Sequence, residues 1–187
     1  MTTSQHAAAA AWITIWQRET FAPSWYRDAA RECSVEGRDA RRREIVLAAC
    51  LAESYLYEWF RDHVVPDDEA ALLQCFPAAN RRRSLADRWK HAVKTAVDQT
   101  WLAGPADFSG PGWADLLKLI EYRNGLLHAG ASRPVSVRPP SQVDPPVPTA
   151  STLDTLAAGW ALDVVIAEIR RLHHLAGTAT PAWLMPF

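Results

Sequence analysis

The sequence has few cysteines and glycines, and it lacks the short motifs that mark common enzyme classes. The three cysteines, Cys33, Cys50 and Cys75, are far apart and form no Cys-x-x-Cys pair. We therefore expect reduced thiols rather than a disulfide framework or a structural zinc site. No Walker loop, Gly-x-Gly-x-x-Gly, His-Glu-x-x-His or Gly-x-Ser-x-Gly motif is present. The sequence thus predicts no cofactor and no metal site.

Charge of one sign and long apolar runs are also scarce. The formal net charge is −1, which excludes a global attraction to nucleic acid or to an anionic membrane. The most apolar late stretch, residues 156–167, is interrupted by Asp163 and is too short to span a bilayer. The first residues lack the basic region and apolar core of a signal peptide. We expect a cytoplasmic protein without membrane contact.

Helical periodicity is what the sequence does have. The 187 residues, of which 49% are hydrophobic, suffice for one good core, and we expect a single domain over 1–187. No strand-like alternation persists, so the prediction is an all-α bundle of about four or five main helices. Turn and capping signals predict helices over 7–21, 24–33, 38–63, 84–101, 113–129 and 151–177, a short segment at 67–76, and an exposed proline-rich loop at 133–149.

The pattern over 38–63 is the longest uninterrupted one. One apolar stripe contains Ile45, Ala48, Ala52, Leu56 and Trp59, and a second stripe beside it passes through Glu53. A helix that is apolar on two sides is usually central in a bundle. Glu53 is therefore expected to be buried or at an interface, where its carboxylate needs a partner.

The stretch Glu121–Gly130 contains the side chains that are best suited to catalysis. Asn124 and His128 are four residues apart, so their side chains share one helix face. Arg123 lies about 140° round the helix from His128, but its long side chain can still reach the same substrate. Gly125 between them costs about 0.5–1 kcal/mol of helix stability relative to alanine, which a close approach by a substrate or a helix would explain.

These three side chains suit metal-free cleavage of an RNA phosphodiester. An imidazole can take the proton of a ribose 2′-hydroxyl or give one to the leaving 5′-oxygen. A guanidinium can hold the phosphate and stabilise its growing charge, and Asn124 can orient either group. Because one histidine cannot easily be base and acid in one step, a symmetric partner would complete the site. The alternative is structural: histidine favours a helix C-terminus, and arginine is common on surfaces.

The motif Arg123-Asn-x3-His128 resembles the Arg-x(4–6)-His signature of HEPN domains, in which Asn commonly follows the Arg. Residues 47–60 look like the earlier core helix of that family, with Glu53 followed by aromatic and apolar positions. Together the two resemblances cover about 45–130. One departure concerns Gly130, at the position where some members carry a modifiable tyrosine.

The resemblance implies a helical bundle that forms a homodimer, with the motifs of the two protomers facing each other. It implies a metal-independent endoribonuclease that leaves a 2′,3′-cyclic phosphate, often in toxin–antitoxin or defence systems, with an antitoxin or regulatory protein as partner. Arg123 and His128 match the catalytic pair, Asn124 the assisting polar residue, and Glu53 the acid near the site.

The sequence leaves open the role of one basic cluster and two alternatives to an enzyme. Arg81, Arg82 and Arg83 form a basic cluster that could guide an RNA backbone, although a solvated helix entrance would also explain it. The chain could instead be a non-catalytic HEPN-like module that binds a nucleotide or a protein and keeps the motif for packing, or a helical regulatory protein. The RNA target and the role of the proline-rich loop do not follow from the sequence.

Overall fold

The computed structural model describes residues 20–79, 83–128 and 150–184, and within these ranges it contains helices and no strand. The predicted all-α class is confirmed. Five helices have twelve or more residues: α2 (Ala22–Cys33), α3 (Arg38–Trp59), α5 (Leu85–Asp98), α6 (Pro111–His128) and α8 (Trp160–Ala176). The shorter elements are η1 (Phe60–Val64), α4 (Glu69–Cys75), α7 (Ala150–Thr155) and η3 (Ala182–Leu184).

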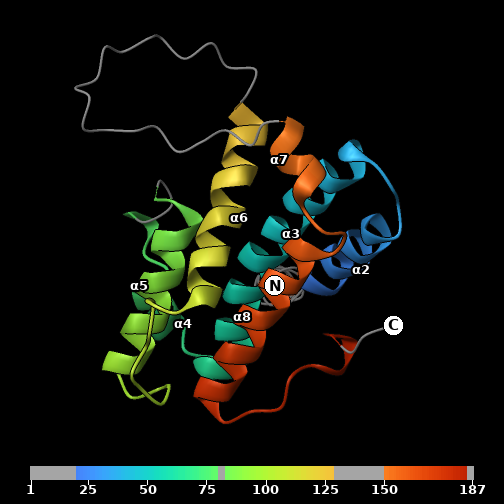
Figure 1. Ribbon diagram of the computed structural model, residues 1–187. Helices are drawn as coiled ribbons and strands as arrows, with labels where there is room; N and C mark the ends of the chain where they lie inside the picture. The colour runs from blue at the N-terminus through green and yellow to red at the C-terminus, as the bar shows by residue number, and fades with distance from the viewer. Residues whose placement is uncertain (1–19, 80–82, 129–149, 185–187) are drawn as a thin grey trace, which may run out of the picture.

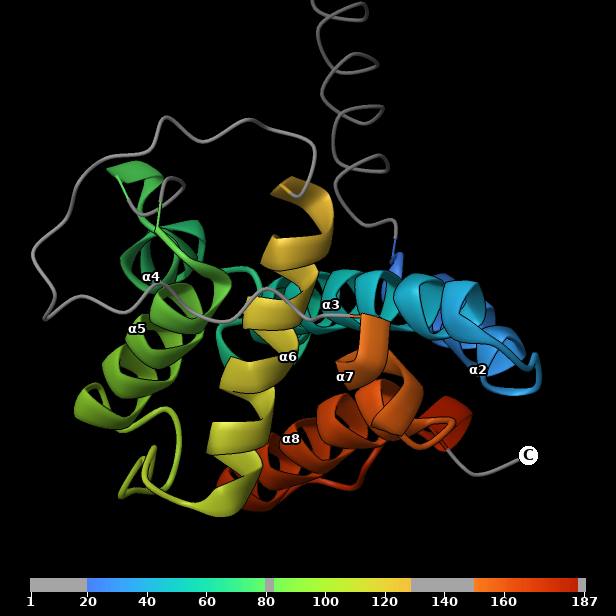
Figure 2. The same ribbon diagram turned by 45° about the horizontal axis from the view of Figure 1, so that its top comes forward.

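Helix α3 is the central element of the bundle, as the sequence predicted. It packs against α2, α6, α7 and α8, and all five residues of its first apolar stripe are at most 2% exposed. Figures 1 and 2 show α6 crossing α3, with α4 and α5 on one side of it and α2 on the other. The buried apolar side chains of these helices form one continuous cluster that includes Trp89 and Leu172. This packing fixes α3, α5 and α6 relative to one another.

Two buried glutamates of α3 stabilise the N-terminal ends of other helices. Glu44 is 1% exposed, and its carboxylate accepts hydrogen bonds from the backbone N–H groups of Gly159 and Ala161 at the start of α8. Glu58 is 8% exposed and accepts from the N–H groups at the start of α2. A carboxylate there pairs orphan donors and complements the helix dipole. The sequence analysis did not identify this role.

The predicted helix over 151–177 is wrong, because it is two helices. The break lies between Thr155 and Trp160, where Gly159 has φ +84°, a conformation that residues with a side chain rarely adopt. Glu44 stabilises the new start at this point. The far end was predicted correctly, since Gly177 ends α8 with φ +64°.

The start of α2 also differs from the prediction. Pro23 does not separate two helices; it lies in the first turn of α2, whose N-cap is Phe21 rather than Ser24. Proline suits this turn because its missing N–H would have no partner there anyway. Thr20 and Phe21 are not helical, and the rest of the predicted helix 7–21, like the proline-rich loop 133–149, lies outside the described residues.

Two other local predictions can be compared with the structure. The Ser84 side chain accepts a hydrogen bond from the Asp87 N–H at 3.1 Å, which confirms the predicted cap of α5. The long helix from 38 reaches its predicted length, but its last turn, η1, is a π-helix.

None of the described helices combines the length and apolarity that crossing a bilayer would need.

Candidate active site

Arg123 and Asn124 lie together near the end of α6. The buried residues Leu116, Leu119 and Ile120 fix the preceding turns in the core. Arg123 and Asn124 are themselves half-buried, and Arg123 Nη1 donates a hydrogen bond of 3.0 Å to Asn124 Oδ1. The amide oxygen thus restrains the guanidinium, and the Asn124 NH₂ group remains a potential donor.

His128 is the last residue of α6, and its side chain lies outside the described part of the chain. Its backbone is one helical turn beyond Asn124, as the sequence predicted. Gly125 between them is buried, so this backbone position is covered within the chain itself.

Glu53 of α3 belongs to the same neighbourhood as Arg123. The Cys50 thiol, one turn before Glu53, is affected by both: burial raises its pKa, the Arg123 charge lowers that pKa, and the Glu53 charge raises it. Both charges therefore act on the Cys50 thiol. The packing of α3 against α6 places the Arg123 charge where it affects this thiol on α3.

The direct partner of Glu53 is Arg88 of α5. Arg88 Nη1 donates to Glu53 Oε1 at 2.6 Å, with the two side chains 27% and 44% exposed. Glu53 is therefore half-exposed at an interface between helices, with the partner that the sequence analysis required. Arg88 Nε is buried and has no acceptor among the described residues, which leaves one donor of this guanidinium unused.

Arg88 was not among the site residues predicted from the sequence. The sequence indicates only that Arg88 follows the Ser84 cap by one turn; its bond to Glu53 depends on how α5 packs beside α3. Arg83 is exposed just before that end, whereas Arg81 and Arg82 lie outside the described residues. The structure thus joins Glu53 of α3 to Arg88 of α5 and Arg123 to Asn124 on α6, and α6 packs against both α3 and α5.

Several other charged or titratable groups take structural roles. In the Arg41–Arg43 run each guanidinium is matched by a carboxylate, from Glu44, Asp39 and Glu32 respectively. His173 is buried and contacts the Tyr55 hydroxyl and Thr178 Oγ1. All three cysteines are free, as predicted. Across the described ranges no cluster of histidine, cysteine and acidic side chains could hold a metal ion.

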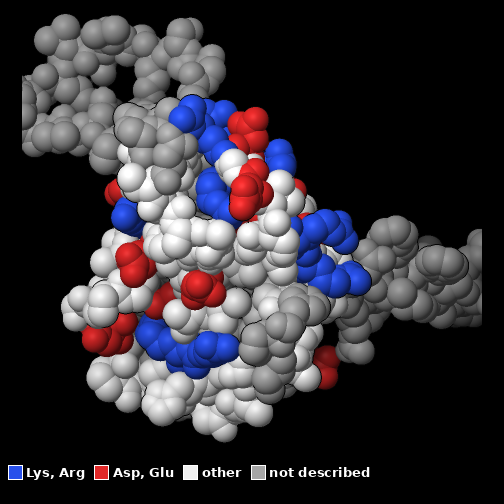
Figure 3. Space-filling model, turned by 45° about the vertical axis from the view of Figure 1, so that its right-hand side comes forward, with Lys and Arg blue, Asp and Glu red and all other residues white. Residues whose placement is uncertain are grey.

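Basic side chains do not form one extended surface on the face in Figure 3, so contact with a polyanion would depend on individual groups. On the face in Figure 3, basic and acidic side chains are interspersed among uncharged ones, so this face presents no extended basic surface. A phosphate would have to be bound by specific guanidinium groups rather than by a general field.

Comparison with protein-family models, with curated proteins and with solved structures finds no match for this chain. The residues and their geometry are therefore what indicates a function for this chain.

Proposed function

We propose that this protein is a metal-independent endoribonuclease of the HEPN type that acts as a homodimer. The observation that carries the proposal is the hydrogen-bonded Arg123–Asn124 pair near the end of α6, which packs against the helix α3 that carries Glu53. The all-helical bundle and the position of His128 at the end of α6 also support it. A toxin or defence role, with an antitoxin or regulatory partner, belongs to the same proposal.

Each side chain has a defined task in the proposed reaction. Arg123 binds the scissile phosphate and stabilises the charge that grows on its oxygens. His128 takes the proton of the 2′-hydroxyl, which attacks phosphorus, and the P–O5′ bond breaks to leave a 2′,3′-cyclic phosphate. The departing 5′-oxygen needs a proton, which His128 of a second copy would supply. Asn124 restrains the Arg123 guanidinium.

Glu53 is a positioning residue in this account. Its carboxylate is bonded to Arg88, so it orients a second guanidinium between α3 and α5. Two guanidinium groups and one carboxylate leave a net positive charge in the cluster, which favours a phosphodiester. Arg83 at the start of α5 would extend this charge along the RNA backbone, together with Arg81 and Arg82.

The proposal is tested with purified full-length protein and RNA in the presence of EDTA. We expect cleavage that falls by at least about a hundredfold in Arg123→Ala and in His128→Ala. Matched controls are Arg170→Ala and His174→Ala, which remove exposed side chains of the same types on α8 and should leave the rate unchanged. Thermal melts of all variants show whether a lost activity is lost folding.

The opposite outcome would favour the non-catalytic alternative. If the folded wild-type protein does not cleave RNA, or if either variant retains full activity, Arg123 and His128 are not a catalytic pair. Sedimentation analysis tests the dimer separately, because a strictly monomeric active protein would contradict the shared site.

A further inference from the structure

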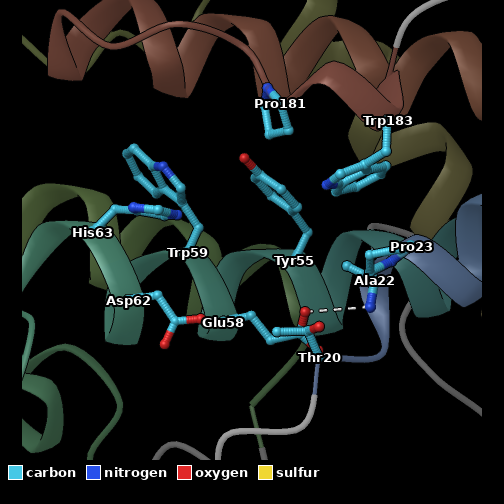
Figure 4. Close-up of a pocket in the computed structure, with 10 residues that line it drawn as sticks. All are labelled: Thr20, Ala22, Pro23, Tyr55, Glu58, Trp59, Asp62, His63, Pro181 and Trp183. Carbon is cyan, nitrogen blue, oxygen red and sulfur yellow. Dashed lines mark hydrogen bonds between the residues drawn. The ribbon is translucent and has the colours of Figure 1, made fainter.

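A small cavity lies on the side of α3 away from Glu53. It has a volume of about 140 Å³ and lies where the start of α2, the end of α3 with η1, and the C-terminal segment meet. Figure 4 shows its lining residues: Thr20, Ala22, Pro23, Tyr55, Glu58, Trp59, Asp62, His63, Pro181 and Trp183. Tyr55 lies about 200° round the helix from Glu53, so the cavity is separate from the candidate active site.

Aromatic rings form much of the lining, and they are held in place. Tyr55 is 4% exposed, and its hydroxyl is bonded to the buried His173. Trp183 makes an edge contact with the Tyr55 ring at 5.9 Å between centroids. Trp59 is 2% exposed and packs edge-on against Phe60. Fixed aromatic faces attract cations through their quadrupoles.

The charged groups of the lining are mainly acidic. Glu58 and Asp62 both border the cavity, and none of the described lining residues is a lysine or an arginine. The Glu58 carboxylate is held by the Phe21 N–H at 2.6 Å and the Ala22 N–H at 3.2 Å, as Figure 4 shows for Ala22. Arg61 holds the Asp62 carboxylate through two hydrogen bonds of 2.6 and 2.8 Å. Both oxygen pairs are thus fixed before any ligand arrives.

Two further features are typical of a binding site. Trp59 lines the cavity, and its Nε1 is buried without an acceptor among the described residues. Asp62 and His63 belong to the π-helical turn η1, and π turns inside helices occur frequently at functional sites.

We propose that this cavity binds a small organic cation of the quaternary ammonium class that also carries an oxygen acceptor. The three aromatic rings surround the cationic head, the Glu58 carboxylate balances its charge, and Trp59 Nε1 donates to the oxygen. A cavity of about 150 Å³ accommodates benzene, so an occupant of roughly six to eight heavy atoms fits. Choline has this size and both groups, and it serves as the probe.

The test compares choline with 3,3-dimethyl-1-butanol, a neutral molecule of the same shape in which carbon replaces nitrogen. Each is titrated into the full-length protein at constant ionic strength, with calorimetry or amide NMR as the readout. We expect saturable binding of choline and an affinity for the alcohol lower by about three- to thirtyfold, the factor that a cation–π contribution gives. Equal affinities, or no saturation by choline, would overturn the proposal.

Variants locate the binding. Trp183→Ala removes a half-buried ring outside the long helices and should weaken choline binding by about tenfold, whereas Trp25→Ala on α2, outside the lining, should not. Unchanged choline affinity in Trp183→Ala would place the ligand elsewhere and overturn the assignment. The comparison of choline with its neutral analogue needs no variant, so it decides the matter even if Trp183→Ala fails to fold. RNA cleavage plays no part in this test, so its result is independent of the proposed function.

Discussion

Glu53 of α3 and Arg88 of α5 are joined by a hydrogen bond of 2.6 Å although 35 residues separate them. Both side chains are partly exposed, so water screens the pair. The bond ties α3 to α5, and both helices neighbour α6, which carries Arg123. Its contribution is therefore more to the arrangement of guanidinium groups than to the free energy of unfolding.

A double-mutant cycle with Glu53→Gln and Arg88→Met measures this contribution. We expect a coupling free energy of about 0.2–1 kcal/mol from urea unfolding, as for other partly exposed ion pairs. The pair Asp39–Arg42, which is more exposed, is the control and should couple no more strongly. A coupling well above this range would mean that the pair is a core interaction and not a surface one.

Removing Glu44 is expected to be far more damaging. Glu44→Ala leaves Arg41 Nη1 and two N–H groups at the start of α8 without their acceptor. Loss of one member of a buried pair costs about 3–5 kcal/mol. Asp39→Ala, on the same helix but 77% exposed, should change the free energy of unfolding by no more than about 0.5 kcal/mol. Similar small effects of both changes in a urea titration would contradict the capping role.

His173 makes folding sensitive to acid. Burial lowers its pKa below the ordinary value of 6.5, and the nearby His63 charge lowers it further. The unfolded chain therefore binds a proton first as the pH falls below about 6.5, and the folded state loses stability from there down to the lowered pKa. Above about 6.5 both states are neutral, and this residue contributes no pH dependence.

The measurement is urea unfolding of the wild type and of His173→Gln at pH 7.5 and pH 5.5. We expect a larger loss of stability between these values in the wild type than in the variant. His174→Gln, which changes an exposed neighbour, should behave as the wild type. An identical loss in the wild type and His173→Gln would show that other groups cause the acid sensitivity.

Local patterns predicted much of the fold. The stripe from Ile45 to Trp59 gave the central helix, because burial of one helix face repeats every three or four residues. Ser84 gave the start of α5, since its capping bond reaches only to Asp87. Gly177 gave the end of α8 for a similarly local reason. These features depend on neighbours in the chain.

What could not be predicted depends on residues distant in sequence. The start of α8 is stabilised by Glu44, which is 115 residues from Gly159, and no periodicity reports such a bond. The π turn at Phe60–Val64 has the same apolar pattern as an α-helix. At the candidate site, Arg123 and Asn124 were named from the motif and Glu53 from the pattern of its own helix, but Arg88 requires knowledge of how α5 packs beside α3.

The most direct test of the central claim is the chemistry of the RNA products. Full-length protein is incubated with a defined RNA in EDTA, and mass spectrometry identifies the new 3′ ends. We expect 2′,3′-cyclic phosphates from the wild-type protein and none from a folded His128→Ala variant, because the imidazole is needed to activate the 2′-hydroxyl. Products that end in a 3′-hydroxyl, or equal cleavage by His128→Ala, would contradict the proposed function.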